Sequence, residues 1–339
     1  MNRGIGEKTL GVGIIGCGRA AVDLHIPALA KVPGFRLSAV CDGDAQRLAQ
    51  AAPANRTLSR HSGYRGLIAD PTVDVVLVTV PPAHHAEIFV AAIEAGKHVY
   101  EEKPLALSRK EADRMATAAA AAPGRCVMGF NLRSHRLVRQ ARALLQAGAI
   151  GRLMALRTTL IGGTVARPVW QRDPSEGGGA IFELGSHHFD LWRYLLNAET
   201  EEVRAQSPSP TDTSTATVSG RLANGTVAIS LLALHGAATH DVEVIGEGGV
   251  LRLSLYRGDS LEIGPASRVG RVANWVRQLP GAARSARLGG DYLDSFRCHW
   301  LRAGACFRGG ESPATLEDGR RALDIALAAQ DAVRAGQLR

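Results

Sequence analysis

The sequence feature that most constrains the fold is a glycine-rich turn between a short apolar run and a helix. The run Leu10–Ile15 predicts a buried strand, and residues 16–21 follow it with the spacing G-x-G-x-x-A. In such a turn the first glycine permits the tight bend, the second lets the backbone approach a pyrophosphate, and the small third residue allows close helix–sheet packing. The helix N-terminus then offers N–H donors and a partial positive charge to the phosphates. We therefore expect the following residues to bind a dinucleotide: Gly16, Gly18, Arg19, Ala20 and Ala21.

An acidic residue ends the second predicted strand, Phe35–Asp42. Asp42 is placed to accept hydrogen bonds from both ribose hydroxyls of an adenosine, and its charge repels a 2′-phosphate. Gly43 and Asp44 follow directly, and the first basic residue after them is Arg47. The expected cofactor is therefore NAD, with NADP possible because of Arg47. The alternative is a chain that has this fold without a cofactor.

The first 130 residues alternate strands and helices. A weak strand is expected near Thr57-Leu58, and Val73–Val80 predicts a strand that is buried on both faces. The other elements expected here are helices His84–Ala95 and Ser108–Ala121 and strands Lys97–Tyr100 and Cys126–Phe130. Alternation at this spacing implies right-handed crossovers and helices on both faces of the sheet. Residues 1–130 are therefore predicted to form an α/β domain with a doubly wound parallel sheet.

The pattern changes after about Leu145. The segments that alternate or are rich in β-formers are 152–161, 213–222, 226–234, 240–246 and 249–256. Asn224-Gly225 is a hairpin signal, so the sheet is expected to be largely antiparallel. Residues 131–315 are predicted to form an α+β domain for substrate binding and oligomerisation, with a loop or insertion at 264–290. Residues 316–339 are predicted to form an amphipathic helix that packs back on the first domain.

Composition limits the classes of protein to which the chain can belong. A length of 339 residues with 45% hydrophobic and 21% charged residues is typical of two globular domains. Only five of the forty basic residues are lysine, and no basic platform interleaved with aromatic residues is present, so the charge of +8 does not indicate nucleic-acid binding. From Arg268 to Arg308 there are eight arginines and two acids. This stretch is either a solvated segment or a rim that attracts an anionic substrate such as a nucleotide sugar.

The expected location is the cytoplasm. No apolar run has the length of a membrane span, and the first residues lack the apolar core of a secretion signal. The five cysteines are scattered and include no C-x-x-C pair, which fits reduced thiols better than a disulfide framework. A membrane partner is therefore not expected.

Two further stretches carry ionisable residues at positions suited to catalysis. Glu101-Glu102-Lys103-Pro104 lies just past a predicted strand, at the carboxyl edge where open α/β sheets bind ligands. Glu183 and His187 are i,i+4 neighbours on a predicted helix, so the carboxylate can orient the imidazole and stabilise its charge. The alternatives are a solvated Lys103 and a hydrogen-bonded interior His187. No metal is expected, because His187-His188 lacks the i,i+4 histidine spacing of a helical zinc site.

Several of these motifs resemble those of one family. Gly-Ile-Ile-Gly-Cys-Gly-Arg at 13–19, Glu-Lys-Pro-Leu-Ala at 102–106, and Gly-Gly-Gly at 177–179 leading to His187 are similar to motifs of the glucose–fructose oxidoreductase/inositol dehydrogenase (Gfo/Idh/MocA) family. The resemblance implies a Rossmann domain, a sheet domain that often forms dimer or tetramer interfaces, and a catalytic set that maps to Lys103, Glu183 and His187. Glu183 departs from the family, in which aspartate is usual.

The resemblance also implies roles for residues around this set. The cofactor would be contacted by Pro81, His85, Glu102 and Lys103. The substrate would be contacted by Lys103, Asn131, Arg133, Trp170, Arg172 and His187. The Lys103–Pro104 peptide bond is often cis in the family, and His188, on another helix face, is expected to be an interior histidine.

The function implied is hydride transfer between NAD and a secondary alcohol or ketone carbon of a sugar, an inositol or a nucleotide sugar. In this scheme His187 is the general base, Glu183 holds its ring, and Lys103 stabilises the developing alkoxide. Two alternatives remain: an NAD-dependent glycosidase or epimerase that oxidises its substrate transiently, and a catalytically decayed NAD-binding regulatory protein. The expected assembly is a homodimer or homotetramer.

Overall fold

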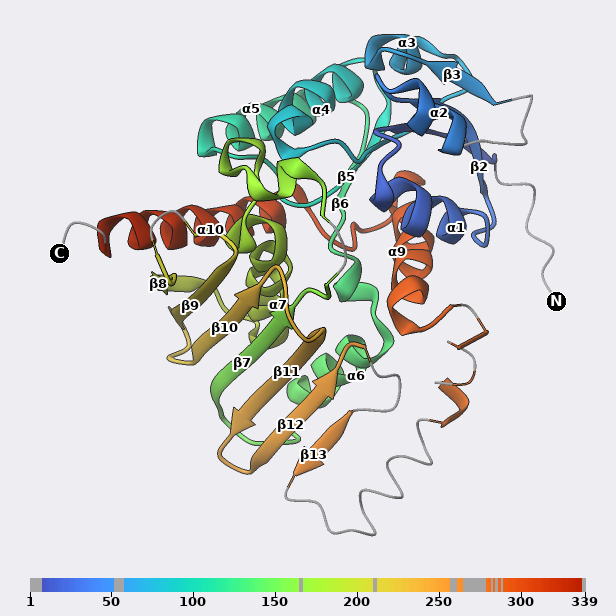
Figure 1. Ribbon diagram of the computed structural model, residues 1–339. Coiled ribbons are helices and arrows are strands. Elements are labelled where there is room, and N and C mark those ends of the chain that lie inside the picture. The colour runs from blue at the N-terminus through green and yellow to red at the C-terminus, as the bar shows by residue number, and fades with distance from the viewer. Residues whose placement is uncertain are drawn as a thin grey trace. The chain divides into compact units, whose positions relative to one another are not determined.

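The computed structural model describes residues 8–51, 58–164, 167–209, 212–256, 261–264, 279–281, 283, 286–287 and 289–336. The chain forms two compact units (Figure 1). The first unit consists of Met1–Gly129 and Phe296–Asp318, and the second of Phe130–Ser295 and Gly319–Arg339. This division differs from the predicted one in two places. The chain returns to the first unit at Phe296, and most of the C-terminal helix groups with the second unit and not with the first.

The first unit contains a six-stranded sheet in the order β3-β2-β1-β4-β5-β6, in which every strand pair of the described chain is parallel. Its strands are β1 Leu10–Ile15, β2 Phe35–Cys41, β3 Ser59–His61, β4 Val75–Val78, β5 His98–Glu101 and β6 Cys126–Met128. The doubly wound sheet is therefore confirmed. The strand order reverses at the β1/β4 pair, which is the position where open sheets of this type bind ligands.

The helices of the first unit connect these strands with the alternation expected. They are the π-helical turn η1 Ala20–His25, α1 Ile26–Leu29, α2 Ala45–Ala51, α3 Tyr64–Ala69, the 3₁₀ turn η2 Pro82–His84, α4 His85–Glu94 and α5 Arg109–Ala121. Helix α5 begins with a capping box, in which the Ser108 hydroxyl accepts from the Glu111 backbone N–H. The third strand begins at Ser59, just past its predicted place, and Thr57 lies outside the described residues.

The returning segment supplies part of the first unit's core. Helix α9 spans Asp291–Phe307, and its Trp300 is fully buried. The Trp300 ring stacks on Tyr100 of β5 with 4.5 Å between ring centroids, and its edge meets Phe35 of β2 at 5.2 Å. These aromatic contacts explain why the segment after Phe296 belongs to the first unit.

The second unit contains a seven-stranded sheet in the order β13-β12-β11-β7-β10-β9-β8. Its strands are β7 Leu153–Ile161, β8 Thr200–Gln206, β9 Thr215–Leu222, β10 Val227–Ala233, β11 Thr239–Gly246, β12 Gly249–Ser254 and β13 Glu262–Gly264. Strands β7 and β10 are parallel, and the other described pairs are antiparallel. The predicted largely antiparallel sheet is confirmed, with β8 and β13 as additional strands.

Helices cover one face of this sheet. The helical elements of the unit are η3 Asn131–Ser134, α6 Arg136–Gln146, η4 Val169–Arg172, η5 Pro174–Glu176, η6 Ile181–Gly185, α7 Ser186–Leu196 and the greater part of α10 Leu316–Gly336. Helix α6 packs against β12 and α7 against β7 (Figure 1). The predicted loop at 264–290 lies mostly outside the described residues, as does much of the arginine-rich stretch.

Among the described residues no helix is both long enough and apolar enough to cross a membrane.

Candidate active site

The glycine turn after β1 has the geometry that its spacing predicts. Gly16 has a φ of +95°, and a Cβ at this position would lie 2.7 Å from the carbonyl group of Thr79. A Cβ at Gly18, in contrast, would meet no heavy atom of the described residues within 4 Å. The backbone at Gly18 therefore borders open space just before η1, where a phosphate can approach the N–H groups of the turn.

The other residues of the G-x-G-x-x-A turn lie in two different environments. Ala21 is fully buried, as its packing role requires. Arg19 is exposed, and its Nε lies 3.5 Å from Asp23 on the next helical turn. Ala20 is partly exposed at the start of η1. Arg19 and Ala20 thus remain accessible for the predicted phosphate contact.

The carboxylate of Asp42 is fixed beside this turn. Its Oδ2 accepts from the Cys17 backbone N–H at 2.7 Å, and its Oδ1 accepts from the Asp44 backbone N–H at 2.9 Å. Asp42 is partly exposed, and a carboxylate has further lone pairs for ribose hydroxyls. The nearby Arg47 lies against Asp44, with Nε 3.7 Å from Oδ2. The open space at Gly18 and the carboxylate of Asp42 together fit the pyrophosphate and the adenosine ribose of NAD.

A buried chain of hydrogen bonds holds Glu102 beyond the end of β5. The indole N–H of Trp300 donates to His25 Nδ1 at 3.1 Å. Because an indole can only donate, the ring proton of a neutral His25 is on Nε2, which donates to Glu102 Oε1 at 3.0 Å. Glu102 Oε2 accepts from the Lys103 backbone N–H at 3.1 Å. Glu102 is 9% exposed, so it acts mainly by holding the backbone of the partly exposed Lys103.

His85, which was predicted to line the cofactor site, is buried with 1% of its surface exposed. Its Nδ1 lies 2.8 Å from the Pro104 carbonyl oxygen and 3.0 Å from Glu101 Oε1, and its Nε2 lies 3.0 Å from the Val80 carbonyl oxygen. Burial lowers the pKa of His85 to about 4, and burial followed by the charge of Glu102 raises the pKa of Glu101. His85 therefore joins the loops after β4 and β5, and a contact between His85 and the cofactor stays a prediction.

Two further residues of this edge were singled out from the sequence. The Lys103–Pro104 peptide bond is cis, as the resemblance implied. Pro81 is partly exposed and directly precedes η2. A contact between Pro81 and the cofactor stays a prediction.

Glu183 and His187 lie on consecutive turns of one helix in the second unit. Glu183 belongs to the π-helical turn η6, and His187 to the first turn of α7. Both side chains are partly exposed. Gln171 Nε2 donates to Glu183 Oε1 at 3.1 Å. No sequence pattern indicated Gln171, because its partner lies twelve residues further along the chain.

The glycine run 177–179 is explained by a chain segment that crosses it. A Cβ at Gly178 would lie 2.4 Å from the Trp170 carbonyl oxygen and 2.6 Å from the Gln171 carbonyl carbon. The Gly178 backbone N–H donates to the Asp173 carbonyl oxygen at 2.8 Å. Gly178 therefore makes room for the backbone of residues 170–173. The glycine run itself lies just before η6, the turn that carries Glu183.

Asn131 and Arg133, which were predicted to contact substrate, are buried. The Arg133 guanidinium forms a two-bond ion pair with Asp190 of α7, with Nε to Oδ2 at 2.9 Å and Nη2 to Oδ1 at 2.6 Å. Asn131 Nδ2 donates to Ser295 Oγ at 2.8 Å. Their exposed fractions are 0% for Asn131 and 8% for Arg133. These side chains hold turn η3 to its neighbours, and their contact with a substrate stays a prediction.

His188 is an interior histidine, as predicted. It is fully buried, with Nδ1 2.8 Å from Thr158 Oγ1 and Nε2 3.2 Å from His240 Nε2. Burial lowers the pKa of His188 to about 3. Burial, with a smaller effect of the neighbouring histidines, also lowers the pKa of His240. The pair holds α7 on β7 and β11, whereas the preceding residue, His187, is partly exposed.

The family models match both units. The model described as the oxidoreductase family with an NAD-binding Rossmann fold matches residues 10–130, and the GFO/IDH/MocA C-terminal domain matches residues 138–252. Inositol 2-dehydrogenase 3 of Saccharopolyspora erythraea is 30% identical in an alignment that covers 97% of this chain and 95% of the relative.

Solved structures have the same fold. The scyllo-inositol dehydrogenase of Lactobacillus casei with bound NAD(H) and scyllo-inositol has a TM-score of 0.76 at 20% identity, with 97% of this chain and 98% of that chain covered. The WlbA dehydrogenase of Bordetella pertussis in complex with NADH and UDP-GlcNAcA has a TM-score of 0.81 at 22% identity, with 98% and 97% covered.

The first unit is an NAD-binding Rossmann domain, since the family model and the geometry at Gly18 and Asp42 agree. The relatives carry the names of dehydrogenases and reductases, and the chain is an NAD(P)-dependent oxidoreductase. It belongs to the Gfo/Idh/MocA family of oxidoreductases.

Proposed function

We propose that the enzyme transfers a hydride between NAD and a secondary alcohol or ketone carbon of a sugar, an inositol or a nucleotide sugar. This proposal rests on the difference in exposure between the predicted catalytic side chains and the ionisable side chains next to them. Lys103, Glu183 and His187 are partly exposed, whereas the adjacent Glu102 and His188 are buried and hydrogen-bonded. This difference in exposure supports a catalytic role for Lys103, Glu183 and His187. The names of relatives and structural neighbours support the substrate class.

Each of the three residues has a distinct part in alcohol oxidation. His187 removes the hydroxyl proton as general base, because an imidazole accepts protons near neutral pH. Glu183 orients the ring and stabilises the imidazolium. Lys103 donates to the substrate oxygen and so stabilises the charge that develops there. Ketone reduction reverses these proton movements, and Trp170 and Arg172 contact the substrate from the segment that crosses the glycine run.

A cofactor-linked substrate screen tests the proposal. The purified enzyme with NAD is offered inositols, sugars and UDP-sugars while NADH absorbance is followed, and one of these classes is expected to give NADH. His187→Ala should abolish the signal, whereas His235→Ala, which changes an exposed histidine of the same unit, should not. Product without net NADH would indicate transient oxidation in a glycosidase or epimerase. Cofactor binding without any product would indicate a regulatory protein.

We also propose that the chain forms a homodimer or homotetramer through the open face of its second sheet. Ser230 of β10 accepts from Trp192 of α7, so the alternate residues of β10 face the other way. These are Val227, Ile229 and Leu231, with exposed fractions of 42%, 42% and 40%. A row of exposed aliphatic side chains on one strand is typical of an interface with a second subunit.

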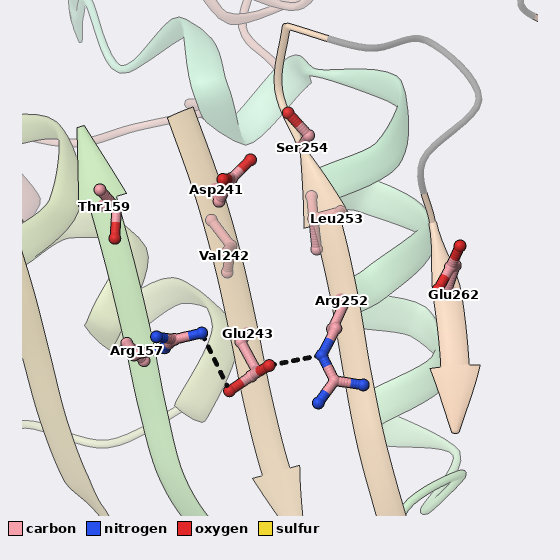
Figure 2. A pocket seen from close by; sticks show the side chains of 9 residues that line it. All are labelled: Arg157, Thr159, Asp241, Val242, Glu243, Arg252, Leu253, Ser254 and Glu262. Atoms are coloured by element: carbon pink, nitrogen blue, oxygen red, sulfur yellow. Dashed lines mark hydrogen bonds and ion pairs between the residues drawn. The ribbon is translucent and has the colours of Figure 1, made fainter. Parts of the chain in front are cut away.

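Charged side chains continue this face across the neighbouring strands. In Figure 2 Glu243 of β11 lies between Arg157 of β7 and Arg252 of β12, and it forms an ion pair with each. Ile229 pairs with Arg157 in the sheet, so the apolar and the charged rows adjoin. Analytical ultracentrifugation should give a multiple of 35.8 kDa, and Ile229→Asp should reduce it. A wild-type monomer would contradict the assembly. A cytoplasmic location is also proposed, with support from the five scattered cysteines, which include no C-x-x-C pair in the sequence.

A further inference from the structure

The segment that crosses the glycine run is joined to the proposed catalytic carboxylate by a side chain. Gln171 lies in the 3₁₀ turn η4 between Trp170 and Arg172. Its backbone carbonyl accepts from the Gly179 N–H at 2.9 Å, and its side-chain Nε2 donates to Glu183 Oε1 at 3.1 Å. Gln171 therefore contacts both the glycine run and the π-helical turn that follows it.

The orientation of the Gln171 amide is determined by a third residue. Gln171 Oε1 accepts from Arg167 Nη1 at 3.3 Å, and Arg167 Nε donates to the Leu234 carbonyl oxygen at 2.9 Å. A guanidinium can only donate, so the amide oxygen must face Arg167 and the amide nitrogen must face Glu183. Arg167, Gln171 and Glu183 thus form a directed chain that begins at the end of the sheet.

We propose that Gln171 is a positioning residue that fixes the carboxylate of Glu183, and that the glutamate at 183 is matched to it. An aspartate at this position would be shorter by one carbon–carbon bond, about 1.5 Å. A contact of 3.1 Å lengthened by such a distance is no longer a hydrogen bond. The departure from the family's usual aspartate then has a physical cause within this chain. The catalytic meaning of this contact rests on the function proposed above.

Spectroscopy tests the contact without a substrate. In protein labelled with carbon-13 at the glutamate carboxyls, the Glu183 resonance is assigned by its loss in Glu183→Gln. Gln171→Met removes the amide and keeps a similar volume, and it should shift this resonance. Val169→Met is the matched control, because Val169 lies in the same turn and is 86% exposed. If Gln171→Met leaves the Glu183 resonance unchanged, the proposal is overturned.

Kinetic measurements then show whether Gln171 positions the carboxylate of Glu183 for catalysis or only supports the local structure. With a substrate that gives NADH, Gln171→Met should lower kcat about tenfold, the effect of one hydrogen bond to a charged group, with an unchanged KM for NAD. Glu183→Asp should lower kcat strongly in the wild-type background and only slightly further in Gln171→Met, since the contact is already lost. Additive losses would contradict the match between the two residues. If the wild type forms no NADH with any substrate, the proposed function fails, and the carboxyl resonance alone decides whether Gln171 fixes Glu183.

Discussion

At the scale of single residues, Asp42 is the residue that we propose to select NAD over NADP. Its carboxylate is held by the backbone N–H groups of Cys17 and Asp44 and remains partly exposed. Asp42→Ala should weaken NAD binding and lower the preference for NAD over NADP by about tenfold or more, because the acceptor for the ribose hydroxyls and the repulsion of a 2′-phosphate are both lost. Titration with each cofactor measures the ratio.

Asp44→Ala is the control for this change. It removes a neighbouring carboxylate but keeps the two oxygens of Asp42, so the ratio should stay close to that of the wild type. A ratio that does not change in Asp42→Ala would show that this carboxylate does not select the cofactor.

The chemical character of the site residues could be predicted from the sequence, but their exposure could not. Lys103 and His187 stand in short motifs, and their predicted places past a strand and on a helix, together with the family resemblance, suggested their chemistry. Arg133 and Asn131 have the polar side chains of ligand-binding residues, yet both are buried. Arg133 pairs with Asp190 and Asn131 with Ser295, which lie 57 and 164 residues further along the chain. Such long-range partners leave no local pattern.

At the scale of secondary-structure elements, the glycine run 177–179 lets the segment 170–173 lie close to the start of η6, the turn that carries Glu183. Gly178→Ala should displace this segment, because the new Cβ would lie 2.4 Å from the Trp170 carbonyl oxygen. We expect turnover to fall about a hundredfold through the shift of Glu183, which is the scale of a displacement of about 1 Å near the reacting groups.

Gly225→Ala serves as a control for this prediction. Gly225 also lies in a turn of the second unit, and its Cβ would meet no described heavy atom within 4 Å, although its φ of +80° makes the substitution mildly destabilising. Turnover should therefore change little in Gly225→Ala. Equal turnover in Gly178→Ala and the wild type would mean that the segment does not position Glu183.

The elements of the first unit were predictable because each one is a local pattern. Apolar runs of strand length alternate with helices, and glycine or proline separates them. The π-helical turns η1 and η6 were not predictable, since an inserted residue that widens a helical turn has no pattern of its own. Strand β8 was missed because its exposed and partly exposed residues carry no apolar alternation.

At the scale of the whole molecule, buried histidines make stability depend on pH. Burial lowers the pKa of His85 to about 4 and that of His188 to about 3. The unfolded chain, in which a histidine has a pKa near 6.5, binds more protons than the folded chain between these values. The free energy of unfolding should therefore have its full value above about pH 6.5. It should fall as the pH decreases, by about 2 kcal/mol for each histidine at pH 5.

Urea unfolding at pH 7, 6 and 5 measures this decrease. His188→Asn should lose its share of the pH dependence as well as some stability at pH 7, because the hydrogen bond to Thr158 is changed. A free energy of unfolding that is constant from pH 7 to 5 would mean that these histidines are not held neutral in the folded chain.

The division into two units was predictable only in part. The change from alternating strands and helices to an antiparallel pattern separates the two sheets in the sequence. The return of residues 296–318 to the first unit depends on Trp300, His25 and Tyr100, whose contacts join distant parts of the chain. Hydrophobic periodicity identifies the helix that contains Trp300 but not the core that it enters.

The most direct test of the proposed chemistry is the turnover of Lys103→Ala with a substrate that the wild type oxidises. Loss of a preorganised donor to the substrate oxygen should lower kcat by about two orders of magnitude or more, with only a small change in the Kd for NAD. Lys110→Ala, which changes an exposed lysine at the start of α5, should behave like the wild type. Turnover that survives in Lys103→Ala with only a raised substrate KM would contradict this catalytic role, because Lys103 would then bind the substrate without taking part in its chemistry.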